Sequence, residues 1–251
     1  MDNKNTAQTI AIFGATSAVA QALARLHANE GDNLLLLARN EEHLESIAND
    51  LKIRGANTVH CINTDLANSD QHPELLKSVA SFSNDIAKYY FFYGVLPDQK
   101  QCEASWELTL DTLNTNFISK TSLLSLIANK IEKEQNRSLI VVSSVAGDRG
   151  RQSNYIYGTG KGALSIFLQG LRNRLQKANC PVVTIKPGFI DTPMTESFEK
   201  NFLWASPEKV ANDIYRAAIK NRDVVYSPWF WRYIMLIIKC IPERIFKKLS
   251  L

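Results

Sequence analysis

The sequence predicts a doubly wound α/β domain, in which helices flank a seven-stranded parallel sheet, with a C-terminal amphipathic extension. Seven short segments are mostly apolar without polar alternation, as expected for strands that helices bury on both faces. Between them lie six segments whose apolar residues recur at helical spacing, which is the rhythm of repeated βαβ units. A chain of 251 residues, 45% hydrophobic and 22% charged, is long enough for one such domain.

The predicted strands and helices alternate along the chain. Each strand is a short, mostly apolar run, and each helix has apolar residues at helical spacing. In such a sheet, ligands bind beyond the carboxyl ends of the strands. The strands are expected at 9–13, 33–38, 58–63, 89–93, 138–142, 182–185 and 223–226, and the helices at 18–30, 41–54, 71–83, 107–133, 154–178 and 207–221.

Composition excludes several classes of function. The formal net charge of +4 is too small to indicate a nucleic-acid partner. The four cysteines form no C-x-x-C pair and have no metal-type spacing to the four histidines, so they are interpreted as reduced thiols, and no metal site is predicted. The uncharged stretch 5–24 is interpreted as a strand, a turn and a helix start. A secretory signal peptide is the less favoured alternative, and a cytoplasmic location is expected.

The turn after the first predicted strand, "FGATSAVA" at 13–20, has features of a pyrophosphate site. Gly14 lets the backbone approach a phosphate at the positive end of a helix. Ala18 and Ala20 stand where glycines are frequent, so by itself the turn is equally compatible with an ordinary tight turn.

The end of the second predicted strand indicates which dinucleotide is preferred. In "LLLLARNEEHL", Arg39 is a guanidinium, and no acid stands at 38–40. A guanidinium suits the 2′-phosphate of NADP, whereas a carboxylate here would suit the ribose hydroxyls of NAD. NADP(H) is therefore the expected cofactor, with NAD(H) as a weaker possibility and a solvated arginine as the alternative interpretation.

The segments "SLIVVSSVAG" and "NYIYGTGKGAL" contain the candidate catalytic groups. Ser144 ends a predicted strand, and Tyr157 and Lys161 are i and i+4 on one helix face, with Cβ atoms about 5–6 Å apart. Tyr155 has Thr159 at that spacing, so of these two tyrosines Tyr157 has the cationic partner.

In this order and spacing, the residues resemble the short-chain dehydrogenase/reductase family over nearly the whole chain. The resemblance implies a Rossmann-like fold and hydride transfer between a nicotinamide and a ketone or secondary alcohol. The ordered set is Gly14-x-x-x-Ala18-Val19-Ala20, Arg39, Asp65-Leu66, Gly94, Asn116, Ser144, Tyr157-x-x-x-Lys161 and Pro187-Gly188-x-x-x-Thr192.

The same resemblance implies a role for each residue. Tyr157 is the general acid, Lys161 favours its anion and binds the nicotinamide ribose, and Ser144 donates to the substrate oxygen. Asn116 holds a water that links Lys161 to solvent. The implied cofactor contacts are Gly14, Thr16, Ser17, Val19, Arg39, Asp65, Leu66, Gly94, Tyr157, Lys161, Pro187, Gly188, Ile190 and Thr192.

Two departures from the family pattern stand out. Tyr93 replaces a small residue in "FFYG", beside the expected adenosine position, and Gly160 replaces the usual serine or alanine before the lysine. Gly158, Gly160 and Gly162 give up about 3 kcal/mol of helix propensity together. The family suggests that they permit close approach to the nicotinamide ribose and to a partner's copy of the helix, so a homodimer or homotetramer is expected.

Residues 229–251 are expected to form one amphipathic, aromatic and basic helix beyond a single domain at 1–228. Its longest uncharged run is eight residues, too short to span a bilayer. Trp229, Phe230 and Trp231, with the basic residues that follow, favour a helix lying in an anionic membrane interface. The alternative is a helix packed on its own subunit or on a dimer partner.

This extension and the "GATSAVA" turn also resemble, more loosely, bacterial relatives of the decaprenylphosphoryl-2-keto-ribose reductases. That resemblance implies a lipid-linked or amphiphilic ketone, with residues 193–206 as a substrate lid. Two other interpretations stay open. One is an enzyme for a small soluble carbonyl compound, and the other is a non-catalytic nucleotide-sensing protein.

Overall fold

A computed structural model describes residues 7–196 and 198–249 and confirms the predicted architecture. One parallel sheet of seven strands has the order β3-β2-β1-β4-β5-β6-β7. From β1 the strands are added toward one edge up to β3, and from β4, which pairs with β1, toward the other edge. The strands are β1 (Thr9–Phe13), β2 (Asn33–Ala38), β3 (Thr58–Asn63), β4 (Lys88–Phe91), β5 (Ser138–Val142), β6 (Val182–Pro187) and β7 (Val224–Ser227).

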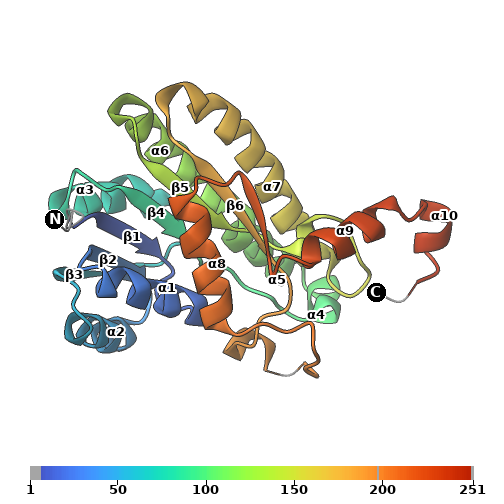
Figure 1. Ribbon diagram of the computed structural model, residues 1–251. Helices are drawn as coiled ribbons and strands as arrows, with labels where there is room; N and C mark the ends of the chain where they lie inside the picture. The colour runs from blue at the N-terminus through green and yellow to red at the C-terminus, as the bar shows by residue number, and fades with distance from the viewer. Residues whose placement is uncertain (1–6, 197, 250–251) are drawn as a thin grey trace.

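Helices cover both faces of the sheet (Figure 1). On one face lie α1 (Ala18–Asn29), α2 (Glu41–Ile53) and α8 (Pro207–Ile219), and on the other lie α3 (His72–Phe82), α6 (Ser119–Glu134) and α7 (Tyr155–Leu175). Successive strand residues supply the two cores in turn, since Ile10 and Ile12 face the first layer while Ala11 and Phe13 face the second. The apolar runs without alternation in the sequence follow from this double burial.

The long helix predicted at 107–133 is interrupted. It begins as α5 (Trp106–Leu113), passes through a π-helical turn at Asn114–Ile118 and continues as α6. A π turn inserts an extra residue into the helical register and is frequent at functional sites. An additional short helix, α4 (Gln99–Ala104), precedes it, and the strand predicted at 89–93 ends at Phe91, after which the chain leaves the sheet.

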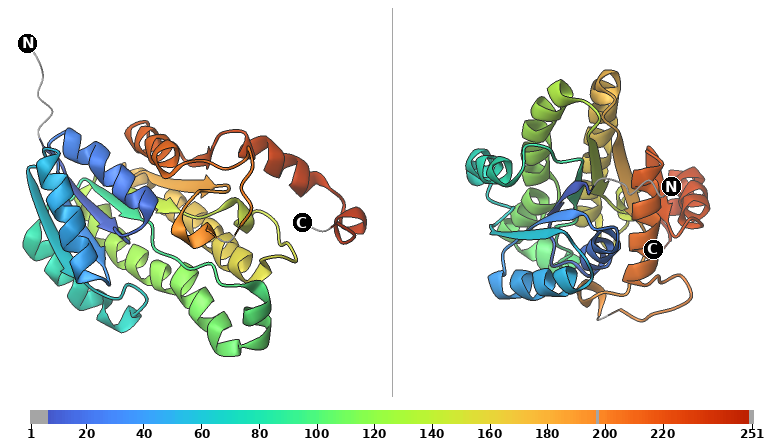
Figure 2. Two further views of the ribbon diagram at one scale, coloured as in Figure 1. Left: turned by 90° about the horizontal axis from the view of Figure 1, so that it is seen from below. Right: turned by 60° about the vertical axis from the view of Figure 1, so that its left-hand side comes forward.

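The C-terminal extension forms two helices where the sequence predicts one. These are α9 (Trp231–Cys240) and α10 (Glu243–Phe246), and Pro242 separates them because proline cannot continue a helix. Residues 250–251 of the predicted segment lie outside the described residues. Figure 1 and the left-hand view of Figure 2 show both helices projecting from the end of the molecule opposite β2 and β3. No helix in the described part of the chain is long and apolar enough to cross a bilayer.

Candidate active site

A cleft of about 500 Å³ lies at the carboxyl ends of the strands, and the structure brings every predicted site residue to its walls. Sixteen residues from separate segments therefore converge on one place, although the role of each stays a prediction. They are Gly14, Thr16, Ser17, Val19, Arg39, Asp65, Leu66, Gly94, Asn116, Ser144, Tyr157, Lys161, Pro187, Gly188, Ile190 and Thr192.

The turn between β1 and α1 has the geometry of a phosphate cradle. Gly14 has φ +87°, and a Cβ on it would lie 2.5 Å from the Tyr93 backbone nitrogen, so only glycine fits. Ser17 precedes the first turn of α1 and makes no side-chain cap there, which leaves the helix N-terminus open toward the cleft. The residues present fit a dinucleotide pyrophosphate at this turn.

The predicted adenosine end of the cleft is exposed. Arg39 follows β2 and is exposed to solvent, and Asp65 follows β3. One Asp65 carboxylate oxygen accepts a hydrogen bond from the Ala67 backbone N–H, at 3.1 Å. Arg39 therefore offers an exposed guanidinium at the place where the 2′-phosphate of NADP is expected.

Asn116 lies in the π-helical turn and is fully buried. Its amide nitrogen donates to the carbonyl oxygens of Val95, at 2.8 Å, and Thr112, at 3.0 Å, and its oxygen accepts from the Val95 N–H at 3.3 Å. A Cβ on Gly94 would fall 2.7 Å from that oxygen. The Asn116 side chain therefore fixes the Gly94–Val95 backbone beside Lys161, and its predicted role in holding water stays a prediction.

Ser144, Tyr157 and Lys161 form the chemical centre of the cleft. The Lys161 ammonium lies 5.5 Å from the centre of the Tyr157 ring and donates to the Val142 carbonyl at 3.3 Å. Burial lowers the pKa of Lys161 to about 8. Burial also raises the pKa of the Tyr157 phenol, while the Ser144 hydroxyl and the Arg151 guanidinium nearby act in the opposite direction. At neutral pH, Tyr157 therefore holds its proton and Lys161 is mostly charged.

The three glycines of α7 allow contacts within this chain. A Cβ on Gly158 would lie 2.8 Å from the Ala146 carbonyl oxygen, and one on Gly162 would lie 3.1 Å from the Gly147 carbonyl oxygen. A Cβ on Gly160 would instead lie 3.2 Å from the Cβ of Asn116. The family-based expectation pointed to a cofactor ribose and a partner's helix. In the structure, the three glycines have no side chain that would keep α7 away from the loop after Ser144 and from the π turn.

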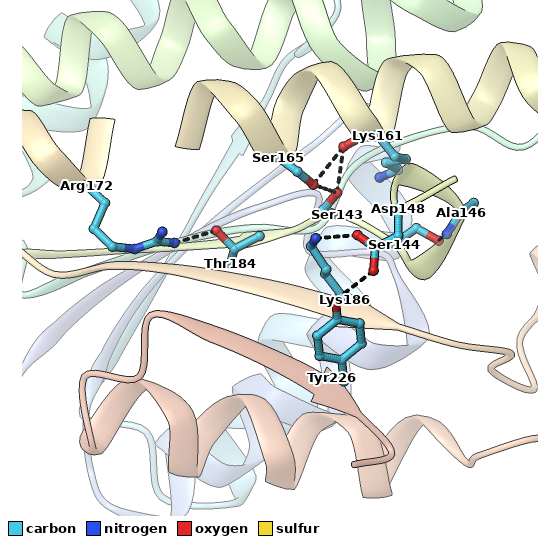
Figure 3. Close-up of polar contacts among 10 residues, drawn as sticks. All are labelled: Ser143, Ser144, Ala146, Asp148, Lys161, Ser165, Arg172, Thr184, Lys186 and Tyr226. Carbon is cyan, nitrogen blue, oxygen red and sulfur yellow. Dashed lines mark hydrogen bonds and ion pairs between the residues drawn. The ribbon is translucent and has the colours of Figure 1, made fainter. Parts of the chain in front are cut away.

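Polar contacts from both sides anchor the segment that carries Ser144 (Figure 3). The Ser143 hydroxyl donates to the Lys161 carbonyl at 2.9 Å. On the other side, the Asp148 carboxylate pairs with the Lys186 ammonium and accepts a hydrogen bond of 2.6 Å from the Tyr226 hydroxyl. The strand end, α7, β6 and β7 are thus joined around the Ser144 loop.

Sequence reasoning missed Lys120, which is fully buried on α6. Its ammonium lies 4.4 Å from the centre of the Tyr93 ring and 3.4 Å from the Thr115 carbonyl oxygen. Desolvation, together with the nearby charge of Lys161, lowers the pKa of Lys120 well below its usual value. The sequence held a signal, because Lys120 precedes Leu123 and Leu124 by three and four residues and so belongs to the apolar face of the helix.

The segment predicted as a substrate lid begins as a short 3₁₀ turn at Pro193–Thr195. Thr192 and Thr195 cap this turn reciprocally, and Ile190 pairs with Ala205 where the chain returns. Ser197, inside the predicted lid at 193–206, lies outside the described residues. Met194 faces the cleft, so the segment bounds it on one side.

The extension also packs beside the cleft, which supports the alternative interpretation of an intramolecular contact for one of its faces. Trp231 and Met235 are buried against Val145, which follows Ser144. The Arg149 guanidinium donates to the carbonyl oxygen of Ile241 at 2.6 Å and to the Glu243 carboxylate at 3.0 Å. The loop after Ser144 therefore holds both α9 and α10.

Comparisons with known proteins show the family to which the chain is similar. A family model described as short chain dehydrogenase matches residues 8–202. A protein of Mycobacterium tuberculosis described as an uncharacterized oxidoreductase is 31% identical over 249 residues, which cover 99% of each chain. Another, from Streptomyces coelicolor, is 27% identical over 249 residues, covering 99% of this chain and 98% of the relative.

Solved structures share the fold at low sequence identity. A variant of actinorhodin polyketide ketoreductase has a TM-score of 0.78 at 18% identity, covering 92% of this chain and 99% of its own. A short chain dehydrogenase from Burkholderia cenocepacia has a TM-score of 0.82 at 17% identity, covering 98% of both chains.

These matches confirm the family predicted from the sequence and, with it, an oxidoreductase of the dehydrogenase/reductase type. None of these four proteins is described as a reductase of a lipid-linked ketosugar, so that looser resemblance stays a prediction. Because the family model spans most of the sequence and the first relative aligns over its whole length, the chain belongs to the short chain dehydrogenase family.

Proposed function

We propose that this chain is an NADP(H)-dependent oxidoreductase that transfers hydride between the nicotinamide and a ketone or secondary alcohol. The observation that carries the proposal is the cleft itself, which has Ser144, Tyr157 and Lys161 in one part and Arg39 in another. The ketoreductase is described as a complex with NADPH and the Burkholderia protein as a complex with NADP, which supports this cofactor class.

The residues that would hold the dinucleotide lie along the cleft. Gly14 and the N-terminus of α1 would bind the pyrophosphate, and Arg39 the 2′-phosphate. Lys161 would bind the nicotinamide ribose, with Gly188 and Thr192 beside the nicotinamide. The bound nicotinamide would supply or accept the hydride.

In the reductive direction, Tyr157 donates its phenolic proton to the substrate oxygen, and Ser144 donates a hydrogen bond to the same oxygen. Burial keeps Tyr157 protonated at neutral pH by raising its pKa, which suits it to act as an acid. In the oxidative direction, the positive charges of Lys161 and Arg151 favour the phenolate. The same residues therefore serve both directions.

Cofactor titration tests this proposal. Nicotinamide fluorescence should show that the wild type binds NADPH more tightly than NADH, and Arg39→Ala should weaken NADPH binding about tenfold or more while leaving NADH nearly unchanged. Arg216→Ala removes an exposed arginine of α8 and serves as the control. Equal effects of Arg39→Ala on both nucleotides would exclude the 2′-phosphate role, and absence of binding to either would overturn the enzyme proposal.

The outer face of α9 supports an amphiphilic, lipid-linked substrate reached at a membrane surface on the cytoplasmic side. Tyr233, Leu236 and Ile237 follow helical spacing on one side of α9 and are 58%, 56% and 66% exposed. Trp229, just before the helix, is 69% exposed. Arg232 and Lys239 line a surface hollow together with Tyr233 and Leu236. Three further exposed cations follow in the extension, namely Arg244, Lys247 and Lys248. Apolar side chains with basic neighbours suit peripheral binding to anionic lipid.

Vesicle sedimentation tests this part separately. The wild type should sediment with phosphatidylglycerol-containing vesicles, and Leu236→Glu/Ile237→Glu should remain in the supernatant. Ile53→Glu, at an 87% exposed apolar residue of α2, is the matched control and should still sediment. Substitution is preferable to removal of 229–251, because removal would also take away Trp231, which packs beside the cleft. Unchanged sedimentation of the double variant would contradict membrane contact through this face.

A second candidate function is reduction of a small soluble carbonyl compound. The observation that favours it is the inner face of α9, where Trp231 and Met235 are buried against Val145. This packing accounts for the apolar residues of that face without a contact to lipid. Under this alternative, neither the wild type nor the double variant would respond to vesicles, while the preference for NADPH would persist.

The exposed apolar residues of the α5–α7 side support a homodimer or homotetramer. Trp106 is 71% exposed, Leu110 44% and Ile166 70%. Such a strip is costly to leave in water and favours association between copies. Light scattering should give a mass of two or four chains, and Trp106→Glu/Ile166→Glu should reduce it to one.

A further inference from the structure

Two arginines of the loop before α7 have contrasting surroundings. Arg149 has its guanidinium hydrogen-bonded to the end of α9 and to Glu243, and it stacks on Phe246 at 3.7 Å from the ring centre. Arg151 lines the cleft with Ser144 and Tyr157. Within residues 7–196 and 198–249, Arg151 makes no side-chain hydrogen bond or ion pair, and its Nε atom is buried without a partner.

Asp148 is the acid whose charge raises the pKa of Arg151, and its carboxylate already has other partners. Its two carboxylate oxygens are taken by the Lys186 ammonium and the Tyr226 hydroxyl (Figure 3). The other titratable group that acts on Arg151 is the Tyr157 phenol, which is neutral when protonated. A guanidinium stays charged in proteins, so Arg151 brings a partly desolvated positive charge to the catalytic end of the cleft without a paired carboxylate.

A second polar atom on the same wall also lacks a partner. Asn154, one residue before α7, lines the cleft, and its side-chain oxygen is buried without a hydrogen bond among the described residues. An amide oxygen and a guanidinium on a cleft wall that the fold itself does not pair must find their partners in water or in a bound ligand. A carbonyl substrate that presents an anionic group and a hydroxyl would satisfy both atoms, since a guanidinium pairs with planar or tetrahedral oxyanions and an amide oxygen accepts from O–H.

We infer that Arg151 and Asn154 form a subsite for an anionic group of the substrate, a phosphate or a carboxylate, placed a short distance from the carbonyl that Tyr157 protonates. This inference rests on the proposed function and deepens it, because it assigns a charge to the substrate. Arg151 binds the oxyanion, and Asn154 accepts a hydrogen bond from a neighbouring hydroxyl. The subsite then selects anionic ketones over neutral ketones of the same shape.

The test compares anionic and neutral ketones as pairs. With NADPH saturating, so that Arg39 is occupied, the binding of dihydroxyacetone phosphate and dihydroxyacetone is measured by the quenching of nicotinamide fluorescence immediately on rapid mixing, before NADPH is oxidised. Acetoacetate and methyl acetoacetate form a second pair that distinguishes carboxylate from phosphate. The wild type should bind at least one anionic member about tenfold more tightly than its neutral counterpart, and Arg151→Gln should abolish the difference. Asn154→Ala should weaken the hydroxylated pair about threefold to tenfold.

Arg216→Gln has the same change of charge on the exposed side of α8 and should keep the full preference. No preference in the wild type for either pair, or equal weakening of anionic and neutral ligands by Arg151→Gln, would overturn the subsite. If NADPH itself fails to bind, the proposed function falls, and the same pairs are titrated against the Arg39→Ala protein by tryptophan fluorescence. An anion preference that Arg151→Gln removes there would still support the subsite, and its absence would refute it.

Discussion

Trp231 of α9 lies directly on Gly188 of the loop that follows β6, so that a Cβ on Gly188 would fall 1.9 Å from the indole nitrogen. Gly188 lines the cleft, whereas Trp231 belongs to the extension. The ring of Phe189 meets the same indole edge-on, with centroids 5.2 Å apart. The extension is thus in contact with the segment expected beside the nicotinamide.

Gly188→Ala should destabilise the protein by about 1–3 kcal/mol, because the indole is rigid and must move to admit the methyl group. Chemical denaturation measures the loss. Gly150→Ala is the control, since no atom of residues 7–196 and 198–249 lies within 4 Å of a Cβ there. In a double-mutant cycle, Gly188→Ala should cost less in a Trp231→Ala background. Equal costs in both backgrounds would show that the contact is not the cause.

Tyr157→Phe should lower the rate of ketone reduction about 10²–10⁴-fold while leaving NADPH affinity nearly unchanged, because it removes the proton donor and keeps the ring. Single-turnover oxidation of bound NADPH with a ketone that the wild type reduces measures the rate. Tyr155→Phe is the matched control on the same helix, where the hydroxyl is exposed and donates to Glu103 at 3.2 Å. Comparable loss in the two variants would argue against Tyr157 as the acid.

Lys120→Met should stabilise the protein near pH 7 by about 1–3 kcal/mol, because methionine fills a similar volume without a buried amine. Burial lowers the pKa of Lys120 in the folded state, so the unfolded chain binds more protons between that value and about 10.4. The stability of the wild type should therefore rise with pH over this interval, and the advantage of the variant should shrink.

Unfolding free energies measured from pH 6 to 10 provide the comparison. Lys133→Met, at an exposed position of the same helix, should change stability by no more than about 0.5 kcal/mol at any pH. An advantage of Lys120→Met that grows with pH would have the wrong sign for a buried amine.

Arg149→Met should release α10 while the sheet remains folded. The substitution removes the donor to the Ile241 carbonyl and the ion pair with Glu243, and carbonyls at a helix end need such partners. Amide hydrogen exchange of residues 238–249 should accelerate about tenfold or more, with β1 and β4 unchanged. Arg174→Met breaks an exposed ion pair between Arg174 of α7 and Glu132 of α6, and it should leave the hydrogen exchange of residues 238–249 unchanged.

The sequence predicted the sheet because its signals are local. Runs such as Asn33–Ala38 need burial on both faces, which parallel strands between helices provide. The cleft could be predicted from the sequence for the same reason. Its residues follow a strand or lie in the first turn of a helix, and the topology brings those points to one edge of the sheet, as for Gly14, Arg39, Ser144 and Tyr157.

Features that depend on contacts between distant segments could not be predicted in this way. The π turn at Asn114–Ile118 arises where the helix carrying Asn116 meets the Gly94–Val95 backbone, and no residue pattern of the helix marks it. Likewise, a one-dimensional stripe of apolar residues in the extension does not say which side packs inward. Contacts with the loop carrying Val145 and Arg149 and with Gly188 determine that side.

The position of α9 between Gly188 and solvent implies a thermodynamic reciprocity. Consider a partner that binds the extension only when α9 is packed on Gly188, and whose binding changes the affinity of the cleft for the nucleotide. By linkage, the nucleotide then changes the affinity of the protein for that partner by the same factor. The indole on Gly188 and the guanidinium of Arg149 are among the contacts through which such a coupling free energy would act.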